Sequence, residues 1–191
     1  TYVDSDICAE ICNLLGNAYM TVGNYDRAYK CYILAQESIR VYQGVDTYAE
    51  VQTLNNLGNF CKKTGKHREA IDYYDDALEM LDRIQGSAPT QYAMLYENKG
   101  TSYTMLGMYD EAMSLFEKCL AINQEIYGEN SSYYATTLCD IASACKSKKE
   151  YDKALKNYND ALSIFHNIYD DKHPAYAETL NGIGDVYFAM G

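Results

Sequence analysis

The residues of this chain that could do catalytic chemistry are few and far apart. Its three histidines, His67, His166 and His173, fall at a helix–helix turn, on a late helix face and in a connection between units. None of them belongs to a Ser/His or Cys/His pair of the kind that activates a nucleophile. No glycine-rich loop of the phosphate-binding kind is present. We therefore expect neither an enzyme nor a bound cofactor.

The cysteines are the other reactive side chains, and there are seven of them, an odd number without paired spacing. Cys8 and Cys12 lie one helical turn apart and could supply half of a metal site. No second pair of ligands has matching spacing, so we predict no metal. We interpret the cysteines as reduced, small hydrophobic residues in or near the core of a cytosolic protein.

Acidic side chains are concentrated in the segment 67–85. Asp72, Asp75, Asp76 and Glu79, here called the acidic strip, share one side of a predicted helix. Like charges one turn apart cost roughly 0.2–0.5 kcal/mol per pair. Two interpretations stay open: a solvated helix face, or a docking strip for a Lys/Arg-rich partner segment.

The whole chain is acidic as well, with a formal net charge of −11. Nucleic acids and anionic membranes attract proteins with an excess of Lys and Arg, so we expect neither as the main partner. No apolar run is long enough to cross a bilayer. A protein or peptide partner is the remaining expectation.

These residues are positioned by a repeat with a period of 42 residues, because Gly16, Gly58, Gly100, Ala142 and Gly184 are equally spaced. A period in this range indicates a solenoid, propeller or array. Amphipathic periodicity predicts helices over 5–22, 25–43, 47–64, 67–85, 89–106, 109–127, 131–148, 151–169 and 173–190. Gly23, Gly65 and Gly107 mark the turns within units. Lys149 takes the same place in the fourth unit, where we predict mild strain. No segment has the period-two alternation of a strand.

Packing positions recur in the same register. Counting the repeated Gly as position eight, position twenty is always Ala, position twenty-four is aromatic and position twenty-seven is small. Small residues let antiparallel helices approach closely, and an aromatic ring fills the space beside them. These positions are Ala28, Ala70, Ala112 and Ala154; Tyr32, Tyr74, Phe116 and Tyr158; and Ala35, Ala77, Cys119 and Ala161.

This pattern resembles the tetratricopeptide repeat. The long unit, with GENSSYYATTL from Gly128 and KHPAYAETLN from Lys172, is similar to the kinesin light chain subfamily. The resemblance implies an all-α, right-handed superhelix of about four and a half repeats and nine helices. We expect a single array over 1–191, with repeats 5–46, 47–88, 89–130, 131–172 and a partial repeat 173–191. Because the array begins and ends within a repeat, we expect a segment of a longer protein.

The resemblance also implies a ligand groove lined by the first helix of each unit, at positions two, five, six, nine, twelve and thirteen. An Asn side chain there can donate and accept hydrogen bonds and so hold the backbone of an extended peptide. Asn is a poor helix former, so its recurrence in mid-helix favours this role, with side chains facing the groove and not the core. The alternative is that these are merely solvated polar groups. The predicted groove residues are Asn13, Asn17, Asn55, Asn56, Asn59, Lys62, Met94, Glu97, Asn98, Thr101, Asp140, Lys146, Asn181 and Asp185.

The leading functional hypothesis is a kinesin-light-chain-like adaptor that holds a partner or cargo peptide in this groove. One alternative is a structural array in a ciliary or cytoskeletal assembly. The other is a regulatory domain attached to an enzyme or signalling module. We expect a cytoplasmic location, with the cytoskeleton or cilium and a motor complex as narrower possibilities.

Overall fold

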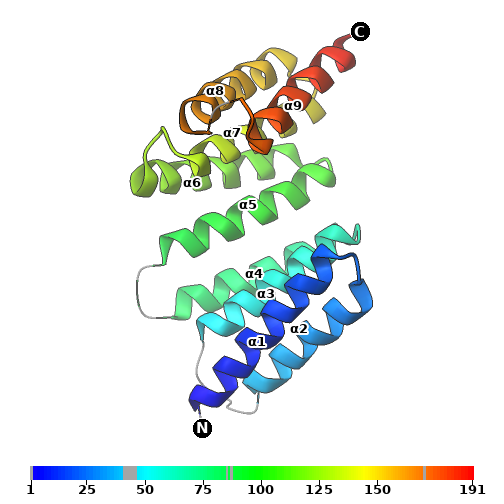
Figure 1. Ribbon diagram of the computed structural model, residues 1–191, viewed down its shortest axis with the longest axis vertical. Helices are drawn as coiled ribbons and strands as arrows, with labels where there is room; N and C mark the ends of the chain where they lie inside the picture. Colours follow the sequence, from blue (N-terminus) through cyan, green and yellow to red (C-terminus); the bar gives the residue numbers. More distant parts are fainter. Residues whose placement is uncertain (1, 41–46, 85, 87, 170) are drawn as a thin grey trace. The chain divides into compact units, whose positions relative to one another are not determined.

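The computed structural model describes residues 2–40, 47–84, 86, 88–169 and 171–191, with the backbone alone at 2–5 and 40. Over these residues the chain forms nine α-helices and no strand (Figure 1). The bounds agree with the predicted helices to within a few residues, and residues 41–43 of the second predicted helix lie outside the described residues. The helices are α1 (Tyr2–Thr21), α2 (Tyr25–Arg40), α3 (Tyr48–Lys63), α4 (His67–Arg83), α5 (Pro89–Met105), α6 (Tyr109–Tyr127), α7 (Ser132–Ser147), α8 (Tyr151–Tyr169) and α9 (Pro174–Met190).

Capping side chains start three of the first helices at the same place in the repeat. Thr47 and Ser131 accept a hydrogen bond from the backbone N–H three residues later. His173 accepts one through Nδ1 from the Ala175 N–H, which gives this histidine a structural role. Each cap satisfies one of the N–H groups that a helix leaves without an internal partner.

The turn that ends the first helix is the same in all four complete repeats. In the second repeat the Lys66 N–H donates to the Cys61 carbonyl at 2.8 Å around Gly65, whose φ is +80°. The fourth repeat makes the equivalent bond from Glu150 to Cys145 at 2.8 Å around Lys149, with φ +67°. The predicted strain at Lys149 is confirmed, because an L side chain in this left-handed region is unfavourable.

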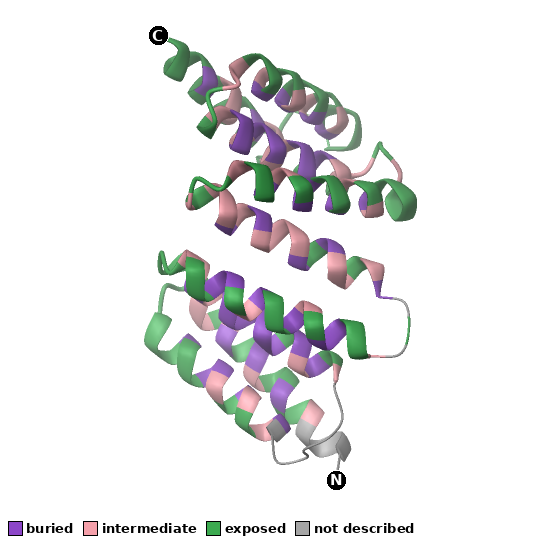
Figure 2. Cartoon of the chain, turned by 180° about the vertical axis from the view of Figure 1, so that it is seen from behind, coloured by how far each residue is buried: buried purple, intermediate pink, exposed green. Residues whose placement is uncertain are grey.

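The helices form two compact units, residues 1–88 and 89–191, which are described separately. Within each unit a helix contacts its neighbours in sequence, and first helices also contact each other: α1 with α3, α5 with α7, and α7 with α9. The helix α3 is buried along much of its length because α1, α2 and α4 all contact it (Figure 2). One continuous array over 1–191 stays a prediction.

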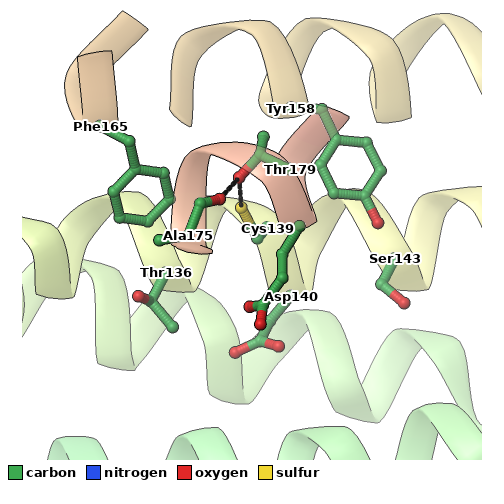
Figure 3. A pocket seen from close by; sticks show the side chains of 9 residues that line it. Thr136, Cys139, Asp140, Ser143, Tyr158, Phe165, Ala175 and Thr179 are labelled. Atoms are coloured by element: carbon green, nitrogen blue, oxygen red, sulfur yellow. Dashed lines mark hydrogen bonds between the residues drawn. The ribbon is translucent and has the colours of Figure 1, made fainter. Parts of the chain in front are cut away.

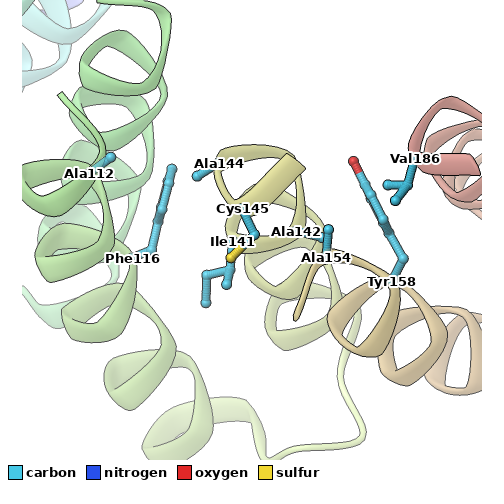
Figure 4. Packing of buried hydrophobic residues seen from close by; sticks show 9 residues of the cluster. All are labelled: Ala112, Phe116, Ile141, Ala142, Ala144, Cys145, Ala154, Tyr158 and Val186. Atoms are coloured by element: carbon cyan, nitrogen blue, oxygen red, sulfur yellow. The ribbon is translucent and has the colours of Figure 1, made fainter. Parts of the chain in front are cut away.

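Each unit has a core of its own residues. In the second unit, Phe116 and Tyr158 lie among small residues of α6, α7 and α8, and Val186 of α9 closes the cluster (Figure 4). In the first unit, Ala28, Tyr32 and Leu57 form the equivalent contact. The predicted small positions are confirmed, since the alanines at position twenty have no exposed surface; they are Ala28, Ala70, Ala112 and Ala154.

Candidate functional site

The polar residue at position nine of the first helix is a hydrogen-bonding partner of the tyrosine at position twenty-four in the first, second and fourth repeats. The Tyr32 hydroxyl donates to Asn17 Oδ1 at 2.7 Å, and the Tyr74 hydroxyl donates to Asn59 Oδ1 at 2.9 Å. A buried phenol needs such a partner. Asn17 and Asn59 therefore satisfy the core aromatic residues of their own repeats, a role that the sequence interpretation missed.

Asn13, Asn55 and Asn56 were expected to face an open groove, and that expectation is wrong. They are buried, with 1%, 4% and 6% of their surface exposed. Asn13 Nδ2 donates to Thr53 Oγ1 at 2.8 Å, and Asn56 Nδ2 donates to Asn13 Oδ1 at 3.1 Å. For Asn13 and Asn56 the reason is the contact between α1 and α3, which brings positions five, six and three of neighbouring first helices together.

The same contact occurs in the second unit with different chemistry. Cys139 at position five lies 3.6 Å from Thr179 Oγ1 at position three of the next repeat. The Thr179 hydroxyl also donates to the Ala175 carbonyl at 2.7 Å, and either Cys139 or Thr179 can be the donor in the contact between them. A polar contact between first helices is thus a recurring packing device, since unsatisfied polar groups in this position would be costly.

The other predicted groove residues are spread over both units. Lys62 of the first unit is half-buried. In the second unit, Lys146 forms an ion pair with Asp185 at 2.9 Å. The Thr101 hydroxyl donates to the carbonyl of Glu97 in its own helix. Half-buried positions are Glu97, Asn98, Thr101, Asp140 and Lys146, and exposed ones are Met94, Asn181 and Asp185.

A pocket of about 270 Å³ lies between α7, α8 and α9, here called the α7–α9 pocket (Figure 3). Five of its residues are at first-helix positions two, five, six and nine, which the resemblance assigns to the groove. Asp140 was among the predicted residues, whereas Thr136 and Glu178 were missed although both occupy position two. The lining residues are Thr136, Cys139, Asp140, Ser143, Tyr158, Phe165, Ala175, Glu178 and Thr179.

The floor of this pocket holds protonated groups at neutral pH. Burial raises the pKa of the Cys139 thiol to about 11. The hydrogen bond with Thr179 lowers this pKa, and the charges of Asp140 and Glu178 raise it. Burial likewise raises the pKa of Tyr158 to about 12, with Ser143 at position nine as its hydrogen-bonding partner. Because the thiolate is the reactive form of cysteine, Cys139 is unsuited to nucleophilic chemistry.

The acidic strip lies on α4 in the first unit, and its four side chains are exposed. Glu79 pairs with Arg83 at 3.2 Å. Burial, followed by the charges of Glu79, Asp72 and Asp75, raises the pKa of Asp76. The strip is therefore a surface of mutually repelling carboxylates on α4.

Metal-ligating side chains do not gather in the described part of the chain. No group of three or more His, Cys, Asp or Glu residues there is arranged to hold a metal ion. His166 contacts Asp171 and His173 stacks on Tyr169. Four cysteines are buried, Cys12 and Cys139 are half-buried, and Cys8 is exposed, so the expected burial is wrong for Cys8. No described helix has the length and apolar character required to traverse a membrane.

Comparison with known families decides the identity of the repeat. The tetratricopeptide repeat model matches residues 7–83, 91–165 and 142–191. The chain belongs to the tetratricopeptide repeat family. The predicted fold class, an all-α tetratricopeptide solenoid, is confirmed.

Solved structures with the same fold include repeat proteins from three different organisms. The crystal structure of BtubC (BKLC) from P. vanneervenii has a TM-score of 0.83 at 19% identity, covering 99% of this chain and 75% of that one. The repeats of a putative kinesin light chain from Podosopora anserina have a TM-score of 0.75 at 15% identity, covering 95% and 86%. A signal-transduction ATPase with a tetratricopeptide repeat sensor from Pyrococcus horikoshii has a TM-score of 0.77 at 20% identity, covering 98% and 28%. No curated protein sequence matches the chain.

Proposed function

We propose that this tetratricopeptide protein is an interaction scaffold that holds an extended segment of a partner protein against the first helices of its second unit. The observation that carries the proposal is the α7–α9 pocket, which lies at groove positions two, five, six and nine. Recognition of an extended peptide needs side-chain pockets beside a path for the backbone. The likeness to kinesin light chain repeats supports an adaptor role, in which the bound segment belongs to a cargo or a motor complex.

The structure changes which residues would bind. Asn13 and Asn56 are engaged in the packing of α1 against α3, and Asn55 is buried, so we assign the peptide contacts to the second unit instead. Thr136 and Asp140 line the pocket and are partly accessible. Affinity for one short peptide should be micromolar, equivalent to about −8 kcal/mol.

A display library of short unstructured peptides, selected against the full chain, tests this proposal. Thr136→Phe places a ring at the pocket mouth and should remove binding of the selected peptides. Ser114→Phe is the matched control, since Ser114 is exposed on α6 and does not line the pocket. Selection of no peptide, or equal binding to both variants, would contradict the proposal.

The acidic strip supports a second candidate, a structural array that docks a basic neighbour through α4. Its four carboxylates are exposed, and the raised pKa of Asp76 reflects their mutual repulsion as well as its burial. Neutralising Asp72, Asp75, Asp76 and Glu79 together would then remove partner capture, while Thr136→Phe would leave it intact. That pair of results would favour the structural array over the peptide adaptor.

A further inference from the structure

The α7–α9 pocket has a strongly one-sided charge. Asp140 of α7 and Glu178 of α9 both line it, and none of the described residues of its lining is basic. Carboxylates that share a partly enclosed space repel one another and favour a cationic occupant.

The rest of the lining suits the stem of a long side chain. Rings of Tyr158 and Phe165 from α8 flank the space, and Ala175 adds an apolar wall (Figure 3). Lys and Arg bury their methylene stems against such surfaces while the charged head meets acceptors, and a ring face adds a cation–π contribution.

The polar groups of the floor are already paired with one another. The Cys139 thiol bonds to Thr179, whose hydroxyl in turn bonds to the Ala175 carbonyl. A ligand therefore needs to supply no donor to the floor and meets its polar partners at the carboxylates. At about 270 Å³ the pocket is smaller than the roughly 300–1,000 Å³ typical of small-molecule sites, so it fits a single side chain.

From this juxtaposition we infer that the pocket receives a Lys or Arg side chain of the bound segment, with its charged head at Asp140 and Glu178 and its stem along Tyr158 and Phe165. The inference rests on the proposed function, because it names the chemistry of the partner at that site. It makes this scaffold a reader of basic segments.

The decisive experiment titrates single-residue probes into the full chain and follows the NMR signals of Thr136, Ala175 and Thr179. The probes are N-acetyl-lysine methylamide, N-acetyl-arginine methylamide and, as a neutral control of similar length, N-acetyl-norleucine methylamide. We expect shifts with the two basic probes, weakening as salt is added, and none with norleucine. Equal shifts with all three probes would overturn the inference.

Matched variants locate the charge. Asp140→Asn with Glu178→Gln should weaken binding of the basic probes at least about 10-fold, as expected when charged acceptors are lost. Glu117→Gln with Glu125→Gln removes the same charge from exposed positions of α6 outside the pocket and should leave binding unchanged. If the first pair disturbs folding, Glu178→Gln alone, at an exposed position of α9, replaces it. Unchanged probe binding in the pocket variant would overturn the inference.

The peptide library separates failure of this inference from failure of the proposed function. Selected peptides that share a Lys or Arg at one position, and that bind poorly when it becomes Met, support both. Selected peptides that share an apolar or acidic residue at that position would support the proposed scaffold function and overturn the assignment of a basic side chain to the pocket. If no peptide is selected, the proposed function fails, and the probe titration still decides whether the pocket binds a cation.

Discussion

At the scale of single residues, the hydrogen bond between positions nine and twenty-four links the polar and aromatic patterns of the sequence. In the second repeat the Tyr74 hydroxyl donates to Asn59. In the third repeat the same two positions hold Phe116, which has no hydroxyl, and Thr101, and the Phe116 ring faces the helix that carries Thr101. We predict that Tyr74→Phe lowers the free energy of unfolding by about 1 kcal/mol, because Asn59 Oδ1 loses its donor. Asn59→Thr in the same chain should recover most of the loss. A double-mutant cycle in urea measures both effects, and additive losses would contradict this coupling.

Lys149 is the second residue whose effect is local. Its φ of +67° is the conformation that Gly23, Gly65 and Gly107 adopt in the equivalent turns. Lys149→Gly should raise the free energy of unfolding by about 1 kcal/mol, because the L side chain costs that much in the left-handed region. Lys149→Ala keeps the Cβ atom and serves as the control in the same thermal unfolding series. A gain for Ala equal to that for Gly would show that the backbone is not the cause.

At the scale of helices, the close approach of a glycine on the first helix to an aromatic ring on the second sets the distance between the two helices of a repeat. A Cβ atom at Gly58 would lie 2.4 Å from Cε1 of Tyr74, whereas one at Gly184 of α9 would meet nothing within 4 Å. Gly58→Ala should therefore cost on the order of 1–3 kcal/mol by overpacking.

Gly184→Ala is the matched substitution and should stabilise this chain by roughly 0.5–1 kcal/mol, because Ala favours a helix more than Gly does. Circular dichroism during thermal unfolding compares the two. Equal effects at both glycines would mean that helix propensity, and not the ring contact, decides the outcome.

The acidic strip makes a pH-dependent prediction for α4. Burial and neighbouring carboxylates raise the pKa of Asp76 above its ordinary value of 3.8, so the folded chain binds a proton there more readily than the unfolded chain does. The charged form then destabilises the fold at neutral pH, and this penalty is lost as the pH falls through the raised pKa to below 3.8. Asp76→Asn should stabilise the chain at pH 7 by roughly 0.2–0.5 kcal/mol per like-charged neighbour.

Urea unfolding of wild type and Asp76→Asn at several pH values measures the difference, which should shrink toward zero in acid. Glu125→Gln, exposed on α6 outside the strip, is the control and should show no comparable gain. A gain for Asp76→Asn that persists unchanged at low pH would refute the electrostatic cause.

At the scale of the whole molecule, the two units have separate cores. Phe116, Tyr158 and Val186 pack among residues of the second unit alone, and the α7–α9 pocket is lined by that unit alone. We predict that fragment 89–191 folds on its own and binds the selected peptides within a few-fold of the full chain. Circular dichroism and fluorescence anisotropy test the two parts. A disordered fragment would show that stability depends on residues 1–88.

The sequence by itself determined the period, the helices and their turns. These features depend on local chemistry: glycine or a strained Lys149 at a left-handed turn, and apolar residues repeating along a helix. The small and aromatic packing positions were also readable, because contacts between adjacent antiparallel helices repeat with the same spacing. The acidic strip needed only helical geometry.

The tertiary structure alone decided the role of the asparagines. A polar residue on a first helix can face solvent, a ring of its own repeat or the next first helix, and periodicity does not distinguish these neighbours. The contact of α1 with α3 buries Asn13 against Thr53, and the Asn59 side chain accepts a hydrogen bond from the Tyr74 hydroxyl. The α7–α9 pocket likewise depends on how three helices leave space between side chains distant in sequence, since packing fills most such gaps. The sequence shows Asp140 and Glu178 as two acidic residues on different helices, but only the packing of those helices brings them to one pocket.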